Sequence, residues 1–244
     1  MPTMTIHIDT LWNGFLDLLF PPKCPFCGAV LTRPGICAAC ADTLPRTTDR
    51  DGFRTVRGLT CTAPLFYEGA VRDTLLALKF SGRASAAEPL GALLATCAAE
   101  RLSGLFDAVA AVPISRERRR TRGYNQAELL AEAACRRWDT RPERLLVKIA
   151  DNPAQSSLPD AAARWKNVAG VYTVAPGADV SGRRVLLVDD ICTTGATLCE
   201  CARVLRDGGA AAVYGLTVAL TPTEGKSTLP ATVARRRSTA SLSR

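Results

Sequence analysis

The segment at residues 185–198, VLLVDDICTTGATL, limits the possible folds of this 244-residue chain more than any other stretch. Its apolar start predicts a buried strand. The strand ends in Asp189 and Asp190, and a turn rich in threonine and glycine then leads into a helix. A plain strand–turn–helix junction explains the threonines and the glycine. It does not explain two adjacent carboxylates at the end of a buried strand, because ionised groups are costly there without partners.

Each part of this segment suits one part of a ribose 5-phosphate. A turn at a helix N-terminus presents backbone N–H groups and hydroxyls to a phosphate, and glycine at position 195 lets the backbone approach a ligand closely. The two carboxylates can accept hydrogen bonds from a vicinal diol. The predicted ribose 5-phosphate site therefore consists of Asp189, Asp190, Thr193, Thr194, Gly195, Ala196 and Thr197.

The same segment resembles the motif with which type I phosphoribosyltransferases bind 5-phosphoribosyl-1-pyrophosphate (PRPP). The resemblance implies that the acid pair holds the ribose hydroxyls and that the loop at 193–197 holds the 5-phosphate. It also implies a catalytic role for Asp189 and Asp190, which would steady positive charge on the ribose in the transition state. Cys192 lies where that family tolerates variety, so no catalytic role is expected for it.

Strands and helices are predicted to alternate between residues 61 and 220. Apolar runs predict strands at 62–67, 107–113, 145–149, 171–174, 184–189 and 211–219, and alanine- and leucine-rich stretches predict helices at 70–80, 85–102, 125–138 and 195–206. Such alternation indicates an α/β fold with a parallel sheet flanked by helices. In such sheets, ligands bind beyond the carboxyl ends of the strands, where the acid pair is expected.

A cluster of arginines follows the predicted strand at 107–113. Residues 115–122 hold five arginines against one glutamate, and residues 221–244 hold five basic residues against one acidic residue. The rest of the chain is near neutral although the net charge is +8, so a broad basic face for duplex DNA is not expected. A short cluster beside the sheet edge suits pyrophosphate with Mg²⁺, and a solvated basic loop is the alternative.

Several motifs together resemble the competence protein F family, a branch of the type I phosphoribosyltransferases that is linked to DNA uptake. The resemblance covers about residues 12–220 and is carried by LKFSGR at 78–83, RGYNQA at 122–127, NPAQSSL at 152–158, RWKNVAGVY at 164–172 and the segment at 185–198. It implies that Arg122, Gly123, Asn125 and Gln126 lie near the pyrophosphate. It also implies a mobile lid at 151–168 that carries Gln155 and Arg164, and a surface loop without a role is the alternative.

Two CxxC pairs stand close together near the N-terminus. Cys24 and Cys27 are separated by nine residues from Cys37 and Cys40, a spacing that can place four thiolates around one structural Zn²⁺. Redox disulfides and an iron–sulfur cluster are the alternatives, and the absence of a flanking βαβ unit favours zinc. The resemblance implies a zinc ribbon here, with either a purely structural role or a role in partner binding. Cys61, Cys97, Cys135, Cys199 and Cys201 lack ligand spacing and are expected as core or surface thiols.

Three regions are expected: a zinc-ribbon module with an N-terminal helix at 1–60, a phosphoribosyltransferase-like domain at 61–220, and a basic, disordered tail at 221–244. Residues 5–20 are apolar but are too short to span a bilayer, so we expect an amphipathic helix without membrane insertion, with His7 on one face. The paired CxxC spacing favours metal binding in the reducing cytoplasm over secreted disulfides.

Three functions fit these features. The first is an enzyme that binds Mg–PRPP and transfers ribosyl 5-phosphate to a nitrogen nucleophile. The second is a non-catalytic sensor of PRPP or nucleotides. The third, implied by the family's link to transformation, is an accessory protein that handles single-stranded DNA or contacts competence-machinery proteins. No residue in the sequence identifies the acceptor or the oligomeric state.

Overall fold

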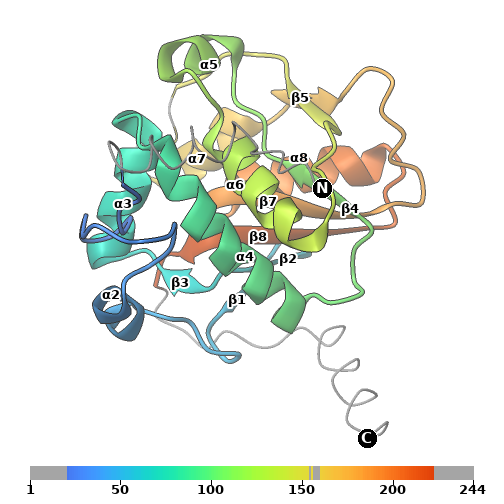
Figure 1. The fold of residues 1–244 in the computed structure, drawn as a ribbon. Coiled ribbons are helices and arrows are strands. Elements are labelled where there is room, and N and C mark those ends of the chain that lie inside the picture. The colour runs from blue at the N-terminus through green and yellow to red at the C-terminus, as the bar shows by residue number, and fades with distance from the viewer. Residues whose placement is uncertain (1–20, 154, 156–159, 223–244) are drawn as a thin grey trace, which may run out of the picture.

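The computed structural model describes residues 21–153, 155 and 160–222. Within these residues, six strands form one sheet in the order β1-β2-β8-β7-β4, with β3 beside β8 (Figure 1). β1 runs antiparallel to β2, and the other pairings are parallel. The strands are β1 Phe53–Val56, β2 Leu59–Thr62, β3 Leu65–Phe66, β4 Ala108–Ala111, β7 Arg184–Cys192 and β8 Ala212–Leu220. The expected α/β fold with a largely parallel sheet is confirmed.

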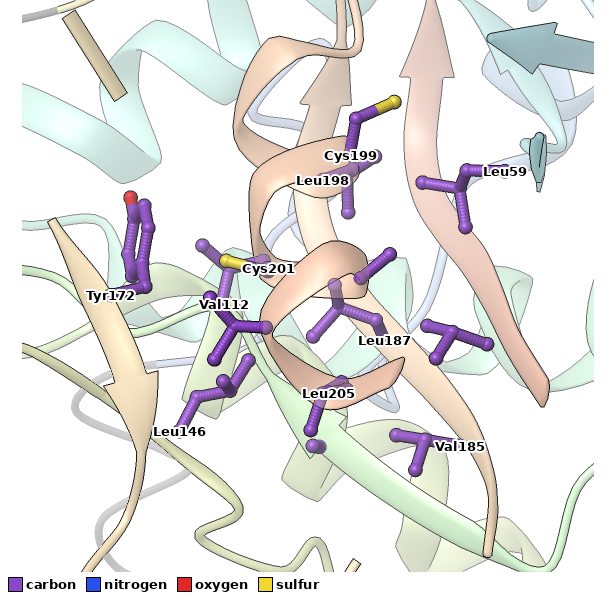
Figure 2. Packing of buried hydrophobic residues seen from close by; sticks show 14 of the residues in the cluster. Leu59, Val112, Leu146, Tyr172, Val185, Leu187, Leu198, Cys199, Cys201 and Leu205 are labelled. Atoms are coloured by element: carbon purple, nitrogen blue, oxygen red, sulfur yellow. The ribbon is translucent and has the colours of Figure 1, made fainter. Parts of the chain in front are cut away.

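Helices cover both faces of this sheet. The described helices are α2 Ala38–Thr43, α3 Gly69–Phe80, α4 Ala87–Arg101, α5 Arg116–Arg122, α6 Gln126–Cys135, α7 Ala161–Val168 and α8 Ala196–Asp207, with short 3₁₀ turns at Ala84–Ala86 and Arg136–Trp138. In Figure 1, α4 and α6 cross the near face of the sheet. Successive side chains of β7 point to opposite faces of the sheet. Leu186 and Val188 pack against α3, α4 and α6, whereas Val185 and Leu187 pack against α8. Figure 2 shows this second cluster around α8.

The parallel register brings two functional segments to the same edge of the sheet. In the ladder between β4 and β7, Ala111 lies opposite Val188, and the backbone N–H of Val112 donates to the carbonyl of Val188 at 2.9 Å. The arginine-rich segment that follows β4 therefore starts beside the acid pair on β7. This is the carboxyl end of the sheet, where ligands were expected.

Some elements differ from the sequence-based predictions. The strand predicted at 62–67 is divided into β2 and β3 around Pro64, which has no N–H to donate to a ladder. The strand predicted at 184–189 continues to Cys192, so the acid pair lies within β7. The predicted arginine-rich loop is the helix α5, because the Ser115 side chain caps its start and Gly123, with a φ of 81°, ends it.

The strands predicted at 145–149 and 171–174 do not join the main sheet. They are β5 Leu146–Lys148 and β6 Tyr172–Val174, which pair antiparallel with each other. The chain between them contains α7 and most of the expected lid, although residues 154 and 156–159 lie outside the described part. Because β5 and β6 flank this segment, the paired strands form the base of the segment.

The expected boundary between residues 60 and 61 falls inside β2, and β1 joins the same sheet. The helix expected at 5–20, His7 and residues 223–244 of the expected tail lie outside the described residues. In the described part of the chain, no helix has the length and apolar character needed to cross a membrane.

Candidate functional site

A cavity of about 420 Å³ opens at the carboxyl ends of β4 and β7. It is bounded by the acid pair, by the loop between β7 and α8, by α3 and by the segment between β5 and β6. Most of the site residues predicted from the sequence line it: Asp189, Asp190, Thr193, Thr194, Gly195, Ala196, Thr197, Arg122, Gln126, Gln155 and Arg164. The fold therefore brings together residues from four separate sequence motifs.

Gly123 and Asn125 do not line this cavity and instead shape the chain behind it. Gly123 ends α5 in the left-handed conformation. The buried Asn125 caps α6, since its Oδ1 accepts from the N–H of Ala127 at 3.0 Å. Its Nδ2 donates to the carbonyl of Val112, also at 3.0 Å. These contacts fix the path from the end of β4 through α5 to α6.

The two acidic residues have different surroundings. Asp190 is 4% exposed, and its Oδ2 lies 2.8 Å from the Nζ of Lys79 on α3. Burial, followed by the charge of Asp190, raises the pKa of Asp189 well above its ordinary value. Burial alone would lower the pKa of Lys79, but the charge of Asp190 and the hydrogen bond to it raise that pKa above its ordinary value. A ligand with several hydroxyl groups could donate hydrogen bonds to these carboxylates, and would thereby lower the free-energy cost of keeping them charged and buried.

Lys79 was not predicted as a site residue. It belongs to the LKFSGR motif, but it is separated from Asp190 by more than a hundred residues, and helical periodicity does not reveal which distant charge it meets. The signal in the sequence was a lysine on the helix that also carries the buried Leu75 and Leu78. Such a lysine requires an acidic partner.

The loop between β7 and α8 has the geometry of an anion site. Gly195 has a φ of 75° and immediately precedes α8, so the loop turns sharply into the helix N-terminus. On the outer side of this loop, Arg54 of β1 donates to the carbonyl of Cys192 at 3.1 Å and to the carbonyl of Thr193. Arg54 was not predicted as a site residue, because it lies in a segment without periodicity.

Positive charge faces the acid pair across the cavity. Arg118 and Arg122 of α5 line the cavity, and no described carboxylate forms an ion pair with either. Arg122 donates to the Oε1 of Gln126 at 3.2 Å. Burial, followed by the charge of Arg118, lowers the pKa of Arg122. By contrast, Arg119 on the outer side of α5 pairs with Glu128 at 2.7 Å. Arg118 and Arg122 thus bring positive charge without a described carboxylate partner to the cavity wall.

The segment between β5 and β6 contacts the loop directly. The Nε2 of Gln155 donates to the hydroxyl of Thr197 at 3.2 Å. The Oε1 of Gln155 and the Nε of Arg164 are buried, and neither has a hydrogen-bond partner among the described residues. Lys148 on β5 also lines the cavity, and burial, followed by the charge of Arg118, lowers its pKa to about 8. These polar groups suit a polar ligand enclosed beneath the segment.

The second candidate site is the cluster formed by Cys24, Cys27, Cys37 and Cys40. The four Sγ atoms all lie within 4.8 Å of one another, and those of Cys27 and Cys37 are 3.6 Å apart. Four sulfurs bound tetrahedrally to zinc are about 3.8 Å apart. The Sγ of Cys37 also accepts from the N–H of Cys40 at 3.4 Å, a contact that favours a thiolate ligand. The cluster therefore fits a structural Zn²⁺. Outside it, the five cysteines predicted as core or surface thiols are all buried.

Comparisons with known proteins match two parts of the chain. The family model described as "Phosphoribosyl transferase domain" matches residues 143–230, and the model described as "Double zinc ribbon domain" matches residues 15–50. The DNA utilization protein YhgH of Escherichia coli (strain K12) is 34% identical over 144 residues, which are 56% of this chain and 61% of that protein. The chain thus spans about three fifths of that relative's length.

Two further relatives extend the comparison. YhgH of Salmonella typhimurium is 30% identical over 201 residues, which are 78% of this chain and 80% of that protein. Competence protein F of Haemophilus influenzae is 35% identical over 106 residues, which are 43% of this chain and 46% of that protein. The names of these relatives refer to DNA utilization and to competence.

Proposed function

This chain belongs to the competence protein F family, with a double zinc ribbon followed by a phosphoribosyltransferase domain, and from that premise we propose that its cavity binds PRPP. One observation carries the proposal. The acid pair and the loop at 193–197 line the same cavity, which is also lined by Arg118 and Arg122, and neither arginine has a carboxylate partner among the described residues. A diol, a phosphate and a pyrophosphate each meet a matching group there.

Each part of PRPP is assigned to one wall of the cavity. Asp189 and Asp190 accept hydrogen bonds from the ribose diol, and the loop at 193–197 with the N-terminus of α8 holds the 5-phosphate. Arg118, Arg122 and Gln126 hold the pyrophosphate. Carboxylate oxygens are suitable ligands for Mg²⁺, which would neutralise charge on the departing pyrophosphate.

The proposed reaction is the transfer of ribosyl 5-phosphate to an acceptor nitrogen. The bond between C1 of ribose and the pyrophosphate oxygen breaks, and pyrophosphate leaves with the electron pair. The lone pair of the acceptor nitrogen then forms the new bond to C1. Asp189 and Asp190 steady positive charge on the ribose, and the segment at 151–168 excludes water that would compete as a nucleophile. Gln155 and Arg164 are the lid residues that act at this step.

Calorimetric titration with PRPP and Mg²⁺ tests the proposal, with Asp189→Asn as the matched variant. We expect micromolar binding that the variant loses. Absence of binding by a folded, zinc-loaded protein would refute both the enzyme and the PRPP sensor. Binding followed by pyrophosphate release with a nitrogen acceptor supports the enzyme. Binding without release, across acceptors of several classes, supports the non-catalytic sensor.

A second hollow favours an additional ligand with a flat face. It has a volume of about 520 Å³ and shares Lys79, Phe80, Arg118 and Arg122 with the first cavity. Phe80 is 60% exposed, and the guanidinium of Arg122 lies 5.0 Å from its ring centroid. An exposed ring beside two arginines that have no carboxylate partner among the described residues suits a base and a phosphate of single-stranded nucleic acid.

DNA handling is therefore the second candidate function. We expect binding of an unstructured oligonucleotide to weaken steeply with salt and to weaken further in Phe80→Ala. Binding that does not respond to salt or to Phe80→Ala would remove this candidate and leave PRPP as the ligand.

We further propose boundaries for the parts of the chain and a location in the cytoplasm. The zinc module ends before Phe53, because β1 already belongs to the main sheet. The basic tail expected at 221–244 starts only after Thr221, which is still hydrogen-bonded to Arg54. A zinc–thiolate cluster and buried free thiols suit the reducing cytoplasm. The zinc site is assigned a structural role.

A further inference from the structure

Arg54 lies on β1, outside both predicted motifs, yet its guanidinium reaches the loop at 193–197. It donates to the carbonyls of Cys192 and Thr193, and also to the hydroxyl of Thr221 at 3.2 Å and to the Thr221 carbonyl. Four contacts from one side chain connect β1 to the ends of β7 and β8. A planar guanidinium can hold several acceptors in one fixed geometry, which lysine cannot do.

These contacts determine which way the loop's peptide groups face. A trans peptide is planar, with its carbonyl and N–H pointing in opposite directions. Because the carbonyls of Cys192 and Thr193 point to Arg54, the N–H groups of Thr193 and Thr194 point away from it. Thr193 and Thr194 line the cavity, so Arg54 and the cavity lie on opposite sides of the loop. Donors are thus turned toward the position proposed for the 5-phosphate.

Other residues of the β1–β2 hairpin support the same loop and helix. A Cβ added to Gly195 would meet a methyl group of Val56 at 3.4 Å, so Val56 packs closely behind the turn. The Cys199 thiol donates to the Val56 carbonyl at 3.2 Å, and Arg206 donates to the Gly58 carbonyl at 3.0 Å. The hairpin therefore contacts α8 and its preceding loop at several points.

We propose that Arg54 is a positioning residue that keeps the N–H groups of the 193–197 loop directed at the 5-phosphate of the ligand. This inference rests on the proposed PRPP function and extends it to a residue that does not touch the ligand. It predicts that Arg54 affects the binding of one part of the ligand and not of the other. Binding of ribose 5-phosphate depends on Arg54, whereas binding of pyrophosphate, assigned to Arg118 and Arg122 on another wall, does not.

The test compares wild type, Arg54→Lys and Arg206→Lys in titrations with ribose 5-phosphate and with Mg–pyrophosphate. Arg206→Lys is the matched control, because Arg206 contacts the same hairpin but not the loop. In Arg54→Lys we expect ribose 5-phosphate to bind about ten-fold or more weakly and pyrophosphate to bind within about two-fold of wild type. Added methylguanidinium should restore part of the loss in Arg54→Ala. A purely structural role predicts equal losses for both ligands, and that result, or no loss for either, would overturn the proposal.

Hydrogen exchange provides a readout that does not require a ligand. In Arg54→Lys, the amides of Ala196 and Cys199, which donate to the Thr194 hydroxyl at 3.4 Å and to the Gly195 carbonyl at 2.8 Å, should exchange faster, while those in the middle of β8 should exchange at the wild-type rate. If the wild-type protein binds neither ligand, the proposed function fails, and the exchange data still decide the role of Arg54. Unchanged exchange at these two amides would then show that Arg54 does not order the loop.

Discussion

Asp189 and Asp190 are neighbours in the chain, but among the described residues only Asp190 has an ion-pair partner. The Nζ of Lys79 lies 2.8 Å from Asp190, whereas Asp189 is partly open to the cavity and its pKa is raised, first by burial and then by its neighbour. A carboxyl whose pKa is raised in the folded state keeps its proton to a higher pH than it does in the unfolded chain. It therefore destabilises the fold increasingly as the pH rises above its ordinary range.

The first prediction concerns Asp189→Asn. This variant should bind no PRPP, yet it should be more stable than wild type at pH 8, by about 1 kcal/mol, because it removes a buried charge. At pH 4 the gain should be smaller, since the wild-type carboxyl still holds its proton in the folded state. Urea unfolding at the two pH values measures the difference. A gain that is larger at pH 4 than at pH 8 would contradict the direction of the pKa shift.

The second prediction concerns the ion pair itself. Lys79→Met should lower the free energy of unfolding by about 2–3 kcal/mol, because it leaves Asp190 buried without its partner. Asp190→Asn in the same chain should recover part of this loss, so the double variant should lose less than the sum of the two single variants. Because the pKa of Lys79 is raised, the lysine keeps its stabilising charge at neutral pH and loses it only as the pH rises through this raised pKa. Additive losses near neutral pH would show that the two residues do not stabilise each other.

At the scale of elements, α4 and α6 approach each other unusually closely. A Cβ added to Gly91 of α4 would lie 2.3 Å from the Cβ of Ala133 on α6, and 2.9 Å from the backbone there. Both residues are buried, and alanines fill much of the surrounding interface. The close approach explains why the chain tolerates a glycine in the middle of a helix, where glycine costs about 1 kcal/mol relative to alanine.

Gly91→Ala is the third prediction. Helix propensity alone predicts a more stable protein, but the added methyl group has no space unless the two helices separate. We expect a net loss of about 1–3 kcal/mol in urea unfolding. Thr96→Ala, at an exposed position of the same helix, is the control and should change stability by less than about 0.5 kcal/mol. Stabilisation by Gly91→Ala would show that packing between α4 and α6 is loose.

The elements also show where sequence reasoning succeeds and where it fails. β7 and α8 were predictable because each carries a periodic apolar pattern between clear turn residues. β1 was not, since its four residues show no regular alternation of buried and exposed positions and form a strand only because β2 lies beside them. The antiparallel pairing of β5 with β6 likewise depends on contacts that periodicity does not encode.

The same distinction holds for the candidate site. The acid pair and the threonine-rich loop are consecutive in the sequence, so their chemistry could be predicted without a fold. Lys79 and Arg54 reach this segment from α3 and β1, more than a hundred residues away. Only the sheet order, which places β2 beside β8 and β8 beside β7, brings β1 to the end of β7.

At the scale of the whole molecule, hydrogen bonds from α3 and α4 help to attach the zinc module to the sheet domain. The hydroxyl of Thr74 on α3 donates to the carbonyl of Pro25 at 2.9 Å, within the first CxxC pair. Arg101 on α4 is 8% exposed and donates to the hydroxyl of Thr47 at 3.0 Å and to the carbonyl of Ala63 at 2.8 Å. Arg101 thus holds the segment that connects the zinc module to β1, the strand that carries Arg54, against the sheet domain.

Removal of zinc is the fourth prediction. The four cysteines lie in a segment with little core of its own, so zinc supplies most of the free energy that folds the module. The sheet domain has its own core on both faces, and Arg101 keeps residues 47–63 in place. Wild type should therefore contain one zinc per chain by elemental analysis, and Cys27→Ala with Cys40→Ala should contain none.

The zinc-free variant should keep its far-UV circular dichroism and its PRPP binding, while its Tm falls by roughly 5 °C as Phe26 and Ile36 lose their packing against the core. Cys135→Ala, which removes a buried thiol outside the cluster, should retain the zinc and separates metal loss from the effect of losing any cysteine. If the zinc-free protein instead unfolds completely or loses PRPP binding, the module and the sheet form one cooperative unit. The path from the cysteines through Arg101 and β1 to the 193–197 loop would then be part of the binding site's support.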